Sequence, residues 1–151
     1  MAECYGVTTG IGTPIALAAA TAKTVIEVAA PSTATARLIQ AAVSFDASAA
    51  AAGIKVELMR YATTGTGTAY TPIKYNGEGQ ARAALCTAKT NDTVEPGTPI
   101  TVEAWYVPNT GGQFWQLPLS RECYLPSSTL LGIRVTSAAV VNCAANLLFE
   151  E

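Results

Sequence analysis

The sequence predicts an all-β, single-domain protein, either an antiparallel β-sandwich or a jelly-roll-like barrel, with an extended N-terminal arm. Three observations support this fold. Apolar and polar residues alternate with a period of two in several stretches, as in strands with one buried face. Clusters of Gly, Pro, Asn and Thr separate these stretches at short intervals. The length of 151 residues suits one domain and is enough to bury a sizeable core.

The alternation is clearest in residues 54–61, 100–106 and 131–136. Alternate apolar residues share one side in each: Ile54, Val56 and Leu58; Ile100, Val102, Ala104 and Tyr106; Leu131, Ile133 and Val135. Weaker patterns predict strands at 24–29, 36–45, 81–88, 113–119 and 140–149. Asn76-Gly77 suits a tight hairpin turn because both central residues of that turn need positive φ. Further turns are expected at 31–33, 63–68, 95–97 and 109–112.

Two segments do not follow the strand pattern. The alanine-rich residues 47–52 favour helix by propensity but are too few for a stable helix, so we expect a loop or single turn there. Residues 1–21 are expected to form an N-terminal arm ahead of a β body at 22–151. The Gly-rich start of the arm predicts a flexible segment until it docks on a neighbour. Its candidate interface residues are Tyr5, Val7, Ile11, Ile15 and Leu17.

Charged residues make up 13% of the chain, against about 25% in typical globular proteins, and the formal net charge is -2. Such a surface fits either a subunit covered by partners or a weakly soluble monomer. Lys and Arg form no basic run, which argues against a nucleic-acid partner. No stretch reaches ~18 consecutive apolar residues, so no membrane partner is expected. The first residues lack a signal-peptide pattern, so we expect synthesis in a cytoplasm without export.

The sequence gives no sign of an enzyme. Histidine is absent, which removes histidine general bases, histidine-assisted nucleophiles and histidine metal ligands. Asp46 and Asp92 lie outside any calcium-loop pattern. We interpret Glu27, Glu57 and Glu103 as a solvated strand face rather than as a glycosidase pair. No catalytic residue, cofactor or metal is therefore predicted.

The cysteines and the aromatic residues are the remaining candidates for a site. Four cysteines form no CxxC motif and are either buried free thiols or partners in disulfides or inter-subunit cross-links: Cys4, Cys86, Cys123 and Cys143. Trp105, Tyr106, Phe114 and Trp115 flank the turn at 109–112, where two paired hairpin strands would bring them together. Buried, this cluster ends the core; exposed, it is a protein interface or a sugar-stacking platform. Trp105, Phe114 and Trp115 are therefore candidate interface residues.

Several phrases of the sequence carry a family resemblance in this order: residues 6–10 (GVTTG), 42–46 (AVSFD), 56–60 (VELMR), 131–136 (LGIRVT) and 148–151 (LFEE). Together they resemble small virion structural proteins of tailed bacteriophages, and among these the capsid decoration, or cement, proteins. The resemblance implies a subunit, often a trimer, that binds the outer surface of the head and reinforces it. It implies two partners, the major capsid protein and further copies of the chain, and a place on the virion after synthesis in the host cytoplasm.

Two other functions are compatible with the same sequence. The chain could be a head–tail connector, tail or fibre-associated protein, or a lectin-like β-sandwich that uses Trp105 and Trp115. The four cysteines depart from the decoration-protein pattern and raise the prospect of covalent reinforcement. We expect them to be partly oxidised in mature particles, with Cys4 on the arm as the thiol that reaches a neighbour.

Overall fold

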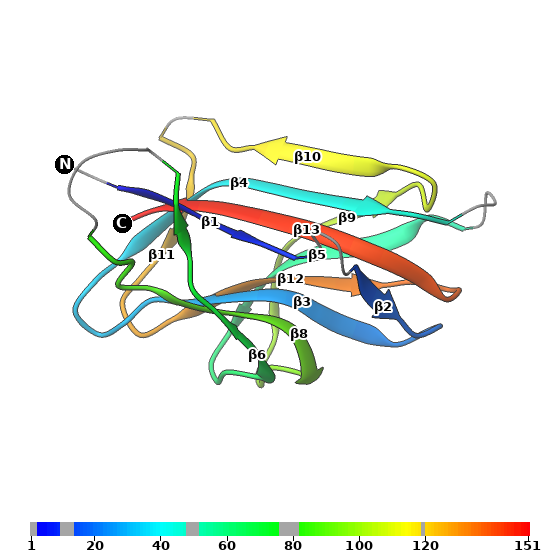
Figure 1. The fold of residues 1–151 in the computed structure, drawn as a ribbon, viewed down its shortest axis with the longest axis horizontal. Helices are drawn as coiled ribbons and strands as arrows, with labels where there is room; N and C mark the ends of the chain where they lie inside the picture. Colours follow the sequence, from blue (N-terminus) through cyan, green and yellow to red (C-terminus); the bar gives the residue numbers. More distant parts are fainter. Residues whose placement is uncertain (1–2, 10–13, 48–51, 76–81, 119) are drawn as a thin grey trace.

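The computed structural model describes residues 3–9, 14–47, 52–75, 82–118 and 120–151. Its strands form two antiparallel sheets packed face to face as a sandwich (Figure 1), and there is no helix in these residues. The predicted all-β fold is confirmed, in its sandwich form. Glu3 and Glu151 exchange two backbone hydrogen bonds of 3.0 Å each, so the two ends of the described chain lie side by side.

The first sheet has β10, β4, β13, β1 and β7 in that order, and β11 and β2 pair with β4 and β13. Its strands are β1 (Cys4–Thr8), β2 (Ile15–Leu17), β4 (Ala36–Phe45), β7 (Ile73–Lys74), β10 (Gly112–Gln116), β11 (Cys123–Leu125) and β13 (Val141–Glu150). Strand β13 lies at the centre, between β4 on one side and β1 and β2 on the other. Figure 1 shows it in red, running the length of the sandwich.

The second sheet has the order β6-β8-β3-β12-β5-β9. Its strands are β3 (Ala22–Ala29), β5 (Ile54–Tyr61), β6 (Thr66–Tyr70), β8 (Thr87–Val94), β9 (Ile100–Val107) and β12 (Leu130–Thr136). The predicted bounds of β4 and β5 agree with the structure. The alternation of β4 changes phase between Leu38 and Gln40, where its register with β13 shifts, and β5 buries residues on both faces. Strand β12 begins one residue before its predicted start.

The core lies between the sheets and follows the period-two pattern. Ile54, Val56 and Leu58 of β5 face Leu147 and other inward residues of the first sheet, and all are almost fully buried. Burying one such side chain stabilises the fold by roughly 1.5–3 kcal/mol. The alternation that predicted these strands therefore also supplies their main stabilising contact.

The N-terminal segment is extended, but its described residues belong to the sandwich rather than to a free arm. Strand β1 pairs with β13 and β7, and β2 pairs with β13. Tyr5, Val7, Ile15 and Leu17, predicted to face a neighbour, are each at least nine-tenths buried in the chain's own core. Their alternation is that of strands with one buried face, and β13 offers them an unpaired edge. Ile11 lies outside the described residues.

Other local predictions differ from the structure or lie outside the described residues. Residues 82–86 of the predicted strand at 81–88 are not a strand, because the Glu151 carboxylate accepts hydrogen bonds from the amides of Leu85 and Cys86, at 2.6 and 2.9 Å. The predicted loop at 63–68 contains the start of β6. The Asn76-Gly77 turn lies outside the described residues, as does most of the alanine-rich stretch at 47–52.

Candidate interaction surface

Two edge strands meet at one side of the sandwich. Strand β9 pairs only with β5, and β10 pairs only with β4, within the described part of the chain. The turn between them crosses from the second sheet to the first, with a hydrogen bond from the Gly111 amide to the Pro108 carbonyl and another from the Phe45 amide to the Gly111 carbonyl. The predicted hairpin pairing of β9 with β10 is therefore wrong, although their aromatic residues do meet.

Trp105 of β9 and Trp115 of β10 stack on each other from opposite sheets. Their ring centroids are 4.1 Å apart and their planes differ by 29°. Both indoles are half-buried and pack against the main core. The stack closes this side of the sandwich, and the indole faces that meet are not available to a sugar ring.

Four large apolar side chains around this stack are exposed, and we call them the open edge. Tyr106 is 76% exposed, Ile100 62%, Phe114 55% and Val102 40%. The one charged residue within β9 is Glu103. Proteins usually protect a long edge strand with Lys or Pro within the strand, with a bulge or with a cover, because unpaired backbone groups recruit other chains. Strand β9 contains neither Lys nor Pro and has a single bulge, so its apolar edge is a candidate docking site for another subunit.

A β-bulge sets which side chains β9 presents. Glu103 lies opposite Leu58 and Thr101 opposite Met59, so Val102 is the extra residue. Ala104 and Tyr106 share the outer side of the sheet with their partners Glu57 and Lys55, whereas Ile100 is paired with Arg60. The prediction that residues 100, 102, 104 and 106 share one side is therefore wrong. The bulge spreads the apolar side chains over both sides of the edge.

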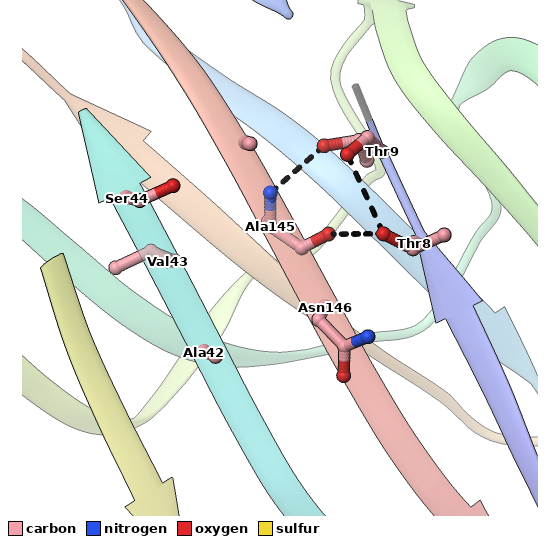
Figure 2. A pocket seen from close by; sticks show the side chains of 8 residues that line it. Thr8, Thr9, Ala42, Val43, Ser44, Ala145 and Asn146 are labelled. Carbon is pink, nitrogen blue, oxygen red and sulfur yellow. Dashed lines mark hydrogen bonds between the residues drawn. The ribbon is translucent and has the colours of Figure 1, made fainter. Parts of the chain in front are cut away.

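The outer face of the first sheet carries a shallow hollow beside β10, shown in Figure 2. The hollow is lined by eight uncharged residues, which belong to β1, β4 and β13 except for Thr9, the residue after β1. They are Thr8, Thr9, Ala42, Val43, Ser44, Ala144, Ala145 and Asn146. The Thr9 hydroxyl accepts a 2.8 Å hydrogen bond from the Ala145 amide, so the Thr9 side chain continues the bonding to β13 just after β1 ends. This neutral hollow has the small side chains that let another surface approach closely.

All four cysteines are free thiols in this chain, so no intramolecular disulfide supports the fold. Cys4, Cys86 and Cys143 are buried. Burial raises the pKa of each of these thiols, that of Cys143 to about 12, which disfavours the reactive thiolate. The expected cross-linking role of Cys4 does not fit its burial in β1. Cys123 is half-exposed, 3.8 Å from the Arg60 guanidinium, and is the thiol that another subunit could reach.

The outer face of the second sheet is covered at Glu27 and Glu57, against the prediction of a solvated face, whereas Glu103 on β9 is exposed. The loops at 62–65 and 95–99 pair through hydrogen bonds between Ala62 and Gly97 and between Gly97 and Thr63, each 3.1 Å. Glu27 and Glu57 lie only 2% exposed on this face. Both loops are rich in Gly, Pro and Thr. This composition predicts turns, but it does not predict that the turns fold back over the sheet.

Each buried glutamate is satisfied by specific partners. Glu57 forms salt bridges with Lys55, at 2.8 Å, and with Arg134, at 3.1 Å. Burial by itself would raise the pKa of Glu57, but the hydrogen bonds and charges of these two partners outweigh it and lower the pKa. Glu27 accepts hydrogen bonds from the Thr64 hydroxyl and, at 2.9 Å, from the Gly65 amide. The Glu27 carboxylate therefore holds the loop at 62–65, whereas the Glu57 carboxylate joins strands β5, β9 and β12 through Lys55, Thr101 and Arg134.

Within the described ranges, no group of three or more His, Cys, Asp or Glu residues could hold a metal ion. In the same ranges, no helix of sufficient length and hydropathy to cross a bilayer is found. No protein-family model, curated protein or solved structure matches this chain. The open edge and the neutral hollow are thus the candidate interaction surfaces of the described residues.

Proposed function

We propose that this chain is a structural virion protein of a tailed bacteriophage that decorates and stabilises the outer surface of the head as a trimer. Its partners in this proposal are the major capsid protein and further copies of itself. The observation that carries the proposal is the open edge, because a long apolar edge strand with one charge is suited to contact with another subunit. The resemblance of the sequence to phage decoration proteins supplies the biological setting.

A ring of three requires a heterologous contact, in which one surface of a subunit meets a different surface of the next. The neutral hollow on the first sheet is the complementary surface for the open edge. Its lining of Ala, Ser, Thr, Val and Asn leaves room for an aromatic ring and places no charge against it. Tyr106, the aromatic member of the open edge on the second sheet, is a side chain of suitable size, whereas Phe114 pairs with Ala42 and borders the hollow of its own subunit.

Two substitutions on the two surfaces test this contact in the purified protein. Tyr106→Lys on the open edge and Ser44→Arg in the hollow should each convert a trimer into a monomer in sedimentation velocity, because each puts an unpaired charge into an apolar contact. Tyr75→Lys is the matched control, since Tyr75 is similarly exposed, at 70%, but lies beyond β7. A wild-type monomer at all concentrations would contradict the trimer.

The place of the protein in the particle is tested by imaging virions and by counting its copies. Density over the outer surface of the head, in hundreds of copies, is the expected result. Density confined to the portal or the tail, in a handful of copies, would replace decoration by a connector or tail role. Particles that lack the protein should release their DNA at lower temperature than complete particles.

A further inference from the structure

One acidic side chain stands apart from the satisfied carboxylates of the second sheet. Asp92 is 3% exposed, and neither of its carboxylate oxygens has a hydrogen-bond partner among the described residues. A buried ionised carboxylate without hydrogen bonds is costly, because it has lost water and gained nothing in exchange. Such a group either carries a proton or strains the structure around it.

The backbone places Asp92 in this position by an irregularity in β8. Strand β6 has one residue, Gly67, between two paired positions, whereas β8 has three, Asn91, Asp92 and Thr93. Asn91 adopts a positive φ of 57°, a conformation that Asn tolerates better than most residues. The bulge therefore turns the Asp92 side chain towards β6 and the loop before it.

Two glycines enclose the carboxyl group. A Cβ atom at Gly67 would lie 2.0 Å from Asp92 Oδ1, and one at Gly65 would lie 2.6 Å from Asp92 Oδ2. The carbonyl oxygens of Thr90 and Val94 flank the same two glycines. These carbonyls offer acceptors to a protonated carboxyl, which has an O–H to donate, but only repel an ionised one.

The charged groups around Asp92 do not neutralise it. Strand β3 contributes Glu27 and Lys23, β8 contributes Lys89, and the loop after β8 contributes Glu95, while residues 62–70 bring no charged side chain. Lys89 already donates to the Thr64 hydroxyl, at 2.6 Å, and to the Gly65 carbonyl, at 2.7 Å. Glu95 accepts from the amide and the hydroxyl of Thr24, at 2.6 Å each. Burial first, and then the charges of Glu27 and Glu95, raise the pKa of Asp92 to about 7.

We propose that Asp92 is a proton-controlled latch, which holds β6 and residues 62–65 on the second sheet when protonated and releases this edge when ionised. Release would uncover the side of β8 that β6 now covers. A hollow lined by Asp92, Glu95, Lys23 and residues of the β2–β3 segment lies beside the buried carboxyl and is the nearest approach for solvent once the edge loosens. The sandwich would then have a second edge for pairing with a neighbour at neutral pH and a closed one in acid.

The sign of the effect follows from linkage. The carboxyl binds its proton more tightly in the folded protein than at its ordinary pKa of 3.8, so folding takes up a proton between the two values. The stabilising contribution is complete below about pH 4 and is lost as the pH rises to about 7. Above that range the ionised carboxylate stays buried at full cost unless the edge opens.

Hydrogen exchange of the complete chain tests the latch. In the wild type, amides of residues 62–70 should open at least about tenfold more at about pH 8 than at about pH 5, after correction for intrinsic exchange, with β5 and β12 unchanged. Asp92→Asn should keep these amides protected at both pH values. Asp46→Asn is the matched control, because Asp46 is exposed and bonded to Asn142, and it should behave as wild type.

A second measurement keeps the proposal testable if Asp92→Asn does not fold. Carboxyl carbon signals of the two aspartates in isotope-labelled wild type should titrate separately, one in acid and one near neutral pH. Two titrations in the acid range would overturn the latch. So would equal opening of residues 62–70 at both pH values in the wild type. Restored protection on adding millimolar calcium at about pH 8 would also overturn it, since Asp92 would then be a cation ligand.

Discussion

The two edges of the second sheet differ in how they are protected. Strand β6 is five residues long, broken by a wide bulge in its partner, and fastened by the loop that Glu27 and Lys89 hold. Strand β9 is eight residues long, and its apolar side chains at 100, 102 and 106 face solvent. Short, bulged and covered edges resist pairing with other chains, whereas long apolar edges favour it. One edge is thus closed by its own structure, whereas the other, despite its single bulge at Val102, leaves apolar side chains exposed.

The closed edge should be the more sensitive to a single added methyl group. Gly67→Ala brings a Cβ atom within 2.0 Å of Asp92 Oδ1 and 2.9 Å of the Thr90 carbonyl, so the bulge must rearrange. We expect a loss of about 2–4 kcal/mol in the free energy of unfolding, measured with urea. Gly111→Ala is the control at the other edge, where no atom lies within 4 Å of the new Cβ, and it should change stability little. Equal effects of the two variants would remove the distinction between the edges.

Beside the open edge, substitution of a stacked tryptophan should lower the free energy of unfolding more than substitution of an exposed open-edge residue. Trp115→Ala removes half of the stack with Trp105 and leaves a cavity at the margin of the core. A loss of about 2–3 kcal/mol is expected, less than for a fully buried tryptophan. The neighbouring Phe114→Ala should cost less than about 1 kcal/mol, because Phe114 is mostly exposed. A costly Phe114→Ala in the monomer would mean that this ring belongs to the core.

The charged cluster next to β9 should respond to acid in the direction opposite to Asp92. The pKa of Glu57 is lowered in the folded protein, so its stabilising contribution is present above its ordinary value of 4.5 and is lost as the pH falls through the folded pKa. Glu57→Gln should cost about 1–3 kcal/mol at neutral pH and remove this acid dependence. Urea unfolding across the acid range measures it. An unchanged acid limb in Glu57→Gln would show that other carboxylates cause it.

The smallest stability change is expected at Ile100 of the open edge. Ile100→Thr should alter monomer stability by less than about 0.5 kcal/mol, because the side chain is 62% exposed. It should nevertheless reduce the rise of Tm with protein concentration, since that rise reports the assembled form. A concentration dependence equal to that of the wild type would place the contact elsewhere.

The sequence predicts the fold where apolar residues alternate along most of a strand. Strands β4 and β5 and most of β13 were predicted because their alternation reports burial directly. Strand β9 was predicted, but its bulge at Val102 was not, because one extra residue leaves no mark on composition. The burial of Glu27 and Glu57 has no local signal, because their partners Gly65, Thr101 and Arg134 are more than thirty residues away in sequence. Tyr5 and Val7 were assigned to a free arm because their partner, β13, is more than a hundred residues away.

The central place of β13 has a consequence for how the chain is made. This strand follows all the others in the sequence, yet it joins β4 to β1 and β2. During synthesis the first sheet therefore cannot close until β13 has emerged, and β1 must wait for a partner more than a hundred residues later in the sequence. The growing chain keeps the apolar faces of β1 and β4 without their central partner for that time. Products truncated before β13 would lack Ala144, Ala145 and Asn146 and so could not form the neutral hollow.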